Sequence, residues 1–369
     1  MRNLLGPLLC RASASALVLA SVWAPGTARA TAPPAPEAPR IPFAERYHAL
    51  LRGGFARAAN ASVTCRTTPD EPSEPSEPSE PPCQAAREGQ VFAVNGDFDM
   101  SYVDVDGDPL TYDSSRAELR LPAGSRVTYA RLYWGGNLLA GEQKPAADDG
   151  RVLIAEPGGA YKELLADTVV GHRTGRGADA FQASADVTGL VRSGGSGLWT
   201  VGQVNAAAGR SGAGAWGGWT LVVAYEDPAQ PLHTLSLWDG FDSLDTPAEV
   251  RLNGLHAPRG ADGRVGLVAY NGDRGSTGDS LTYTTAGHAP VPLQDSADPA
   301  DDVLNSTINE PGPVRARREP AYANTLGYDS DVFDLGTGLA HGGDQLTFRL
   351  VSQRDAAWAG ALFAAVDAR

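Results

Sequence analysis

The sequence predicts an all-β protein of the β-sandwich or jelly-roll type, built as two packed lobes. Short apolar or alternating runs recur from Val91 onward, and Gly, Pro, Asp and Asn separate them. Amphipathic helical spacing is almost absent over the same span. Many short strands at this spacing are typical of sandwiches and jelly rolls. The expected strands span residues 91–94, 100–105, 117–121, 126–134, 151–155, 167–171, 181–187, 198–204, 219–225, 232–238, 249–252, 265–270, 281–285, 332–335, 346–351 and 361–366.

The strand expected at 219–225 is the strongest of these elements. Its side chains alternate between two sides of a strand, and neither side carries a charge until Glu226. We therefore predict a central strand that is covered on both faces. The segment 227–231 after it contains two prolines and divides a first β lobe at 91–228 from a second at 229–369. The sequence leaves open whether these lobes are separate domains or halves of one structure.

Residues 1–30 have the features of a secretory signal peptide. Arg2 and Arg11 give a basic start, residues 16–23 are mostly apolar, and residues 28–30 form a small-x-small cleavage site. The apolar run is shorter than the roughly 20 residues that cross a bilayer. We expect a secreted, extracellular protein that has no transmembrane anchor after signal cleavage.

The next segment, 31–54, is expected to be an Ala/Pro-rich linker that leads into a short helix-like segment at 41–52. Phe43, Tyr47, Leu50 and Leu51 in that segment have a weak helical spacing.

Residues 55–90 are expected to contain an N-terminal strand at 55–65 and a loop of Glu-Pro-Ser repeats. The chain has 3 cysteines, and Cys10 would leave with the signal peptide. An isolated pair of cysteines in an exported protein is most simply a disulfide, so we expect Cys65 and Cys83 to be bonded and to close the loop. A bridge across about 18 residues contributes about 3 kcal/mol in the chain-entropy model.

Charge and motifs exclude several classes of function. The formal net charge of −14 makes nucleic acid a poor partner. Residues 212–217 match G-x-G-x-x-G, but a strand follows instead of a helix, so a dinucleotide site is not expected. There is no G-x-S-x-G or H-E-x-x-H motif, and the 6 histidines are scattered singly. No catalytic residue is predicted.

Asp104, Asp106 and Asp108 place three carboxylates within five residues around a glycine. Calcium prefers such oxygen ligands, which makes this run a candidate Ca²⁺ site and Ca²⁺ the one candidate cofactor. The spacing is not that of an EF-hand, and Asp-Gly is a strong turn dipeptide. A plain hairpin turn is therefore the favoured interpretation, with calcium as the alternative.

Two further acidic sets and one tryptophan are candidate contacts for a ligand. Asp273 and Asp279 form one set, and Asp329, Asp331 and Asp334 form the other. Such residues usually cap turns, so either set becomes a site only if its loops converge in space. Trp216, in a glycine-rich loop, is expected to be partly exposed and to offer a flat face to a sugar or a protein.

Several ordered motifs resemble a known family. They are Tyr102-Val-Asp-Val-Asp-Gly-Asp108, Leu121-Pro-Ala-Gly124, Ala130-Arg-Leu-Tyr-Trp-Gly-Gly136, Ala185-Asp-Val-Thr188, Gly218-Trp-Thr-Leu-Val-Val-Ala-Tyr225 and Gly278-Asp-Ser-Leu281. The chain resembles the head region of uncharacterised bacterial secreted or cell-surface proteins, a domain of unknown function that often precedes tandem β-sandwich repeats. The resemblance implies export and an all-β fold, and it brings no activity. The chain stops at Arg369 without such repeats or a wall-sorting signal, so covalent surface anchoring is not expected.

The sequence thus favours a non-catalytic, secreted β-sandwich protein that binds a glycan or a cell-envelope component, for example in adhesion. One alternative is a secreted hydrolase that acts on polysaccharide through Asp/Glu pairs, since such carboxylates need to meet only in space. Another alternative is a structural envelope component without a small ligand.

Overall fold

The computed structural model describes residues 41–67, 82–285, 287–313 and 315–369. The signal peptide, the proline-rich part of the linker and the Glu-Pro-Ser repeats lie outside the described residues. The described chain is mostly strands, with short helices only, so the predicted all-β fold is confirmed. Residues from Glu37 to Arg369 form one compact unit. No described helix combines the length and hydropathy that a membrane crossing requires.

The strand β1 (Ile41–Ala61) joins the two halves of this unit. Its first half pairs with β12 (Leu232–Ser243) and its second half, from Gly53, pairs with β11 (Gly217–Glu226). The prediction of a helix-like segment at 41–52 is therefore wrong, because these residues belong to strand β1. Residues 47–52 alternate between half-buried and exposed, which is the period of a strand, and pairing with the distant β12 overrides the weak local spacing.

The chain up to Glu226, together with the short strand β17 from a later part of the chain, forms a first jelly roll of two sheets. Its inner sheet has the order β1, β11, β5, β9, β8, and its outer sheet has the order β17, β4, β10, β6, β7. The predicted central strand at 219–225 is β11, which is buried on both faces up to Ala224. The strands other than β1 and β11 are β4 (Ser114–Leu119), β5 (Arg126–Asn137), β6 (Arg151–Ala155), β7 (Lys162–Leu165), β8 (Thr168–Gly175), β9 (Ala178–Asp186), β10 (Gly197–Gly202) and β17 (Arg318–Glu319).

The second half repeats this plan, except that β8 and β17 have no counterpart in it. Its inner sheet has the order β12, β21, β14, with β18 and β19 both paired to β14, and its outer sheet has the order β13, β20, β15, β16. When β8 and β17 are left out and β18 and β19 are counted as one strand, each roll has eight strands in chain order. The first, eighth, third and sixth then form the inner sheet, and the second, seventh, fourth and fifth form the outer sheet, which is a jelly roll. The strands other than β12 are β13 (Ala248–Ala257), β14 (Gly263–Tyr270), β15 (Ser280–Thr285), β16 (Val291–Pro292), β18 (Tyr328–Asp329), β19 (Val332–Asp334), β20 (Gly343–Val351) and β21 (Trp358–Asp367).

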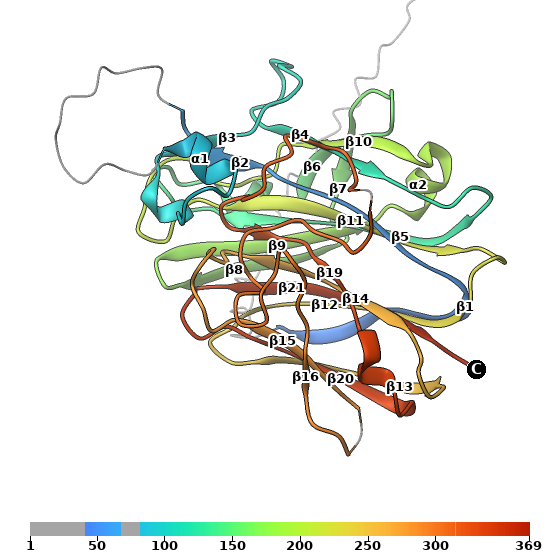
Figure 1. The fold of residues 1–369 in the computed structure, drawn as a ribbon. Helices are drawn as coiled ribbons and strands as arrows, with labels where there is room; N and C mark the ends of the chain where they lie inside the picture. Colours follow the sequence, from blue (N-terminus) through green and yellow to red (C-terminus); the bar gives the residue numbers. More distant parts are fainter. Residues whose placement is uncertain (1–40, 68–81, 286, 314) are drawn as a thin grey trace, which may run out of the picture. The chain divides into compact units, whose positions relative to one another are not determined.

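The two jelly rolls pack through their inner sheets, which gives four successive layers (Figure 1). One core lies inside each roll, and a third lies between the inner sheets. In the third core, Trp216 packs against Tyr270 with ring centroids 5.7 Å apart. Gln182 of β9 reaches across the same interface and donates to the carbonyl oxygens of Gly240 and Gly360. The two lobes are thus halves of one structure.

The remaining elements flank the first roll. They are β2 (Val63–Cys65), α1 (Cys83–Arg87), β3 (Met100–Tyr102), α2 (Thr188–Gly194) and the 3-10 turns η1 (Asn95–Asp97) and η2 (Ala146–Asp148). A third 3-10 turn, η3 (Gly336–Leu339), belongs to the second roll.

The prediction of a strand at 91–94 is wrong. The backbone there bonds to side chains and not to a neighbouring strand: Val94 N donates to Asp97, and Ala93 O accepts from Asn324.

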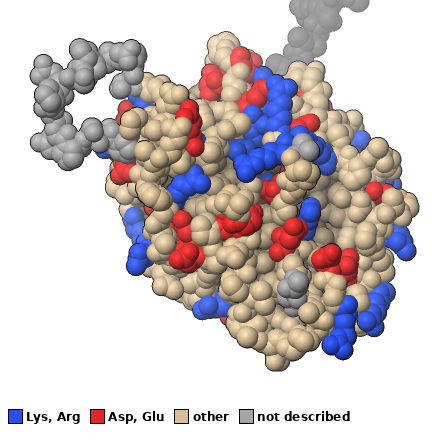
Figure 2. Space-filling view, in the orientation of Figure 1, with Lys and Arg blue, Asp and Glu red and all other residues tan. Residues whose placement is uncertain are grey.

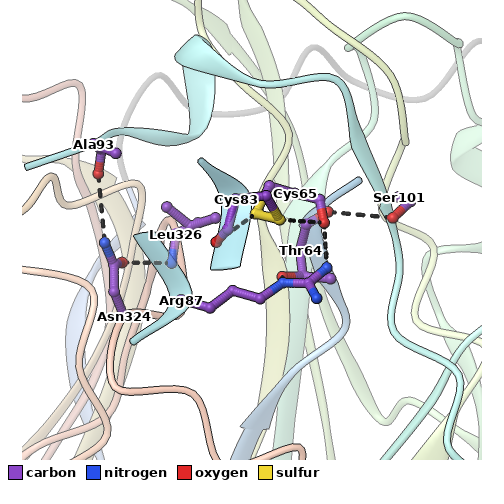
Figure 3. Close-up of a disulfide and its surroundings, with 8 residues drawn as sticks. All are labelled: Thr64, Cys65, Cys83, Arg87, Ala93, Ser101, Asn324 and Leu326. Carbon is purple, nitrogen blue, oxygen red and sulfur yellow. Dashed lines mark hydrogen bonds between the residues drawn. A yellow bond between two sulfur atoms is a disulfide. The ribbon is translucent and has the colours of Figure 1, made fainter. Parts of the chain in front are cut away.

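The predicted disulfide between Cys65 and Cys83 is confirmed, and it ties the end of β2 to the start of α1 (Figure 3). The side chain of Cys65, one of the two bonded cysteines, is fully buried. Arg87 of α1 donates to the Thr64 hydroxyl at 2.9 Å and to the Cys65 carbonyl, so α1 is fixed to β2 by polar contacts as well.

Candidate functional site

A groove of about 700 Å³ lies where β1 passes from one jelly roll to the other. One wall is the second half of β1, from Gly53 to Arg57, with Tyr225 of β11 beside it. The floor is the inner sheet of the second roll, where β14, β19 and β21 contribute residues. Its volume is in the range of sites that bind small molecules. We call this site the inter-roll groove.

Aromatic side chains form the apolar part of the inter-roll groove. Phe55 and Phe363 lie edge to face, with ring centroids 5.4 Å apart, and Tyr225 lies on the same side. Gly266 makes room for Phe363, because a Cβ atom on Gly266 would lie 2.0 Å from Cζ of that ring. Phe55 and Tyr225 are half-buried, so each presents part of its ring to the groove.

Polar and charged side chains form the polar part of the inter-roll groove. Arg264 pairs with Asp334 at 2.8 Å, His233 pairs with Asp367 at 3.1 Å, and Arg57 lies 3.9 Å from Glu310. These pairs supply both hydrogen-bond donors and acceptors, and with Asp262 the lining has four carboxylates against two guanidinium groups, so its formal charge is acidic. Such a surface suits a neutral ligand rich in hydroxyl groups better than an anion.

The structure places Trp216 differently from the sequence prediction. The side chain is fully buried in the core between the inner sheets, so the expected partial exposure is wrong. The glycine-rich loop that precedes β11 lies against the second roll, and this contact buries the indole on Tyr270. Trp216 is therefore a residue of the roll-to-roll interface.

The carboxylates of Asp104, Asp106 and Asp108 bond their own loop. Asp104 accepts from Gly107 N and from the Ser114 hydroxyl, and Asp106 accepts from Asp108 N. These bonds agree with the favoured interpretation of a turn. Across the part of the chain that the structure describes, no group of three His, Cys, Asp or Glu residues is arranged to hold a metal ion.

The two other acidic sets converge at one end of the second roll, with one exception. Asp329 and Asp331 lie around Thr307, and Asp279 is near enough for its charge to raise the pKa of Asp329. Asp273 belongs to the same region, where its main-chain N donates to Asp355. The exception is Asp334, which lies in the inter-roll groove.

Thr307 is the centre of this convergence. Its hydroxyl lies 2.7 Å from Oδ1 of Asp298 and 3.1 Å from Oδ1 of Asp331, and its main-chain N donates to Asp329 at 3.1 Å. All three aspartates are fully buried. We call Asp298, Asp329 and Asp331 the Thr307 cluster. Sequence reasoning missed Thr307 and Asp298, because both lie in a long irregular segment where no pattern distinguishes them.

Burial gives the carboxyl groups of this region raised pKa values. Burial, with the Asp355 charge nearby, raises the pKa of Asp273 to about 7 and that of Asp279 to about 8. Burial also raises the pKa of Asp298 to about 7 and that of Asp329 and Asp331 well above the usual range. These carboxyl groups therefore hold a proton to higher pH than an exposed aspartate does.

Comparison with known proteins adds no relative: no protein-family model, curated protein or solved structure matches the chain.

Proposed function

We propose that this protein is an exported, non-catalytic binding protein whose inter-roll groove takes a sugar-like ligand of the cell envelope or the extracellular surroundings. The observation that carries the proposal is the combination of Phe55, Tyr225 and Phe363 with hydrogen-bonding side chains of both kinds in a groove of about 700 Å³. Aromatic faces pack against the C–H faces of sugars, and fixed donors and acceptors bond their hydroxyl groups.

Export is supported by the leader-like N-terminus and by the disulfide. A bridge between Cys65 and Cys83 persists in oxidising compartments and is rare in the cytosol. The sequence motifs that resemble bacterial secreted or cell-surface head regions support the same location.

The charge distribution also favours a neutral ligand. On the face drawn in Figure 2, acidic and basic side chains are interspersed, and basic groups gather near β4. There, Arg120 pairs with Glu118 and Arg317 pairs with Glu319. Because these arginines are partnered by carboxylates, the basic group is not a free stripe of the kind that binds nucleic acid.

The experiment is a glycan and polysaccharide panel that measures both binding and product release. We expect binding without turnover, and we expect Arg264→Ala to weaken it by about 10-fold or more, because a charged donor contributes roughly 1.5–3 kcal/mol. The matched control is Arg349→Ala, which removes an arginine paired with Glu249 on the outer sheet. Release of product would instead support a hydrolase. An absence of binding across the panel would contradict a glycan-binding function.

A further inference from the structure

The contacts of the Thr307 hydroxyl require a proton on one of the buried carboxyl groups around it. The hydroxyl lies 2.7 Å from Oδ1 of Asp298 and 3.1 Å from Oδ1 of Asp331, but it has only one proton to donate. One of the two carboxyl groups must therefore donate to the hydroxyl in turn. Oδ1 of Asp331 already accepts from Asn309 N at 2.8 Å, so the proton belongs on Asp298. The donors thus form a chain from Asp298 through Thr307 to Asp331.

The other oxygens of the Thr307 cluster also lack partners that would neutralise a charge. Oδ2 of Asp329 and Oδ2 of Asp331 are buried and accept no hydrogen bond among the described residues. Arg57 acts on Asp331 through its charge, but its guanidinium group donates to main-chain oxygens, those of Ser330 and Asn309. A buried carboxyl group in this setting is strongly disfavoured without its proton. The other titratable groups that act on the cluster are Asp279, Asp295, Arg318 and Tyr328.

The Thr307 cluster joins two parts of the second roll. Asp298 and Thr307 belong to the irregular segment between β16 and β17, whereas Asp329 ends β18 and Asp331 immediately precedes β19. The segment lies along this edge of the inner sheet, because main-chain hydrogen bonds connect the two. These bonds are Ser330 N to Thr307 O and Val332 N to Asn309 O, each at 3.0 Å. The carboxyl groups are therefore placed at the contact between the segment and the sheet.

The same segment completes one wall of the inter-roll groove. Glu310, the residue after Asn309, lines the groove and lies 3.9 Å from Arg57. Arg57 also lines the groove, and it donates to Asn309 O at 3.1 Å and to Ser330 O. A displacement of the segment from the sheet edge therefore changes the groove wall, because both side chains depend on it.

We propose that the Thr307 cluster is a pH-sensitive switch, whose carboxyl protons hold the irregular segment on the sheet edge and whose deprotonation releases the segment and alters the groove wall. Loss of the protons places negative charges side by side in a buried site, where they repel one another. Burial raises the pKa of Asp298 from 3.8 to about 7, so its contribution is present in full below pH 3.8 and is lost as the pH rises through about 7. The part of this proposal that concerns ligand binding rests on the function proposed above.

Hydrogen exchange in the full-length protein, measured at about pH 5 and about pH 8.5, tests the switch. After correction for the intrinsic pH dependence of exchange, we expect the protection of the Thr307 and Asn309 amides to be about 10-fold or more lower at the higher pH. Both amides donate to carboxylates of the cluster. The amides of Leu221 and Val223 in β11 should keep their protection. Equal protection of Thr307 and Asn309 at the two pH values overturns the proposal, and this result does not depend on any variant folding.

Amide variants separate titration from packing. Asp298→Asn and Asp331→Asn introduce groups of nearly the same shape that do not ionise. We expect Asp298→Asn to retain most of the protection at the higher pH, because its amide can donate to the Thr307 hydroxyl as the protonated carboxyl group does. The control Asp344→Asn, at an exposed aspartate, should show the wild-type loss. A full wild-type loss in both Asp298→Asn and Asp331→Asn overturns the assignment of the switch to this cluster.

A glycan that binds at about pH 5 distinguishes this proposal from the proposed function. We expect its affinity for the wild type to fall by about 10-fold or more at about pH 8.5, and its affinity for Asp298→Asn to change less. Unchanged affinity together with lost protection overturns the connection between the segment and the groove. If no glycan binds at either pH, the proposed function fails, whereas a loss of protection still supports the switch.

Discussion

The roll-to-roll interface depends on one buried amide, and replacing it should destabilise the whole unit. Gln182 is fully buried; its Nε2 lies 3.0 Å from Gly240 O and 3.1 Å from Gly360 O, and its Oε1 accepts from the Tyr270 hydroxyl at 2.9 Å. The two carbonyls lie where the pairing register of β12 and β21 shifts, between Asp239 and Asp242. Gln182 of the first roll thus completes an interrupted ladder in the second.

The expected effect of Gln182→Leu follows from the groups that it leaves without a partner. Leucine has a similar volume, but it makes none of the three hydrogen bonds. Each buried polar group that loses its partner costs about 1–3 kcal/mol, so the loss of three partners should lower the free energy of unfolding by about 3–9 kcal/mol. Because one sheet runs through both rolls, we expect a single cooperative transition in the variant as well.

Urea denaturation followed by tryptophan fluorescence and by far-UV circular dichroism measures this effect. The control is Gln143→Leu, at an exposed glutamine of the first roll, which should change stability by less than about 0.5 kcal/mol. A loss below about 1 kcal/mol in Gln182→Leu would refute the assigned role of the amide. Two separate transitions would refute the conclusion that the rolls unfold as one unit.

Three further predictions concern stability. Replacing Cys65 and Cys83 together by alanine should lower the free energy of unfolding by about 3 kcal/mol in urea, and an unchanged midpoint would contradict this. Burial raises the pKa of Asp273 from 3.8 to about 7, so the folded state holds this proton more tightly than the unfolded state. The contribution of this proton to stability should be present in full below pH 3.8 and lost as the pH rises through 7, and Asp273→Asn should flatten that part of the stability curve. Gly266→Ala should cost about 1–3 kcal/mol, because its Cβ would overlap the Phe363 ring; thermal unfolding at wild-type temperature would contradict that packing.

Local sequence patterns correctly predicted a buried strand and a disulfide, because each depends on residues that lie near one another in the chain. The alternating apolar run at 219–225 became β11, and the cysteine pair became a disulfide. The first half of β1 was missed, because its partner β12 lies far away in sequence and long-range pairing leaves only a weak local pattern. The repeat of two jelly rolls has one faint sequence signal: Ala215-Trp-Gly-Gly218 and Ala357-Trp-Ala-Gly360 stand at the starts of the two eighth strands.

For the candidate sites too, the sequence indicated local features but not the contacts between distant parts of the chain. The acidic sets at 273–279 and 329–331 were visible as composition, but only the tertiary fold could show that Asp329 and Asp331 meet at Thr307 and that Asp273 meets Asp355. Trp216 was predicted to be exposed from its glycine-rich surroundings, yet the second roll covers it. The inter-roll groove had no sequence signal at all, because its residues come from strands that are distant in the chain.

Hydrogen exchange with a glycan selected from the panel tests the central claim, that the inter-roll groove is the binding site. We expect ligand-dependent protection of main-chain amides at Gly53–Arg57 and at Gly263–Gly266, the wall and the floor of the groove. Protection confined to the outer sheets, β13 and β20 or β4 and β10, would contradict the claim even if the glycan binds tightly.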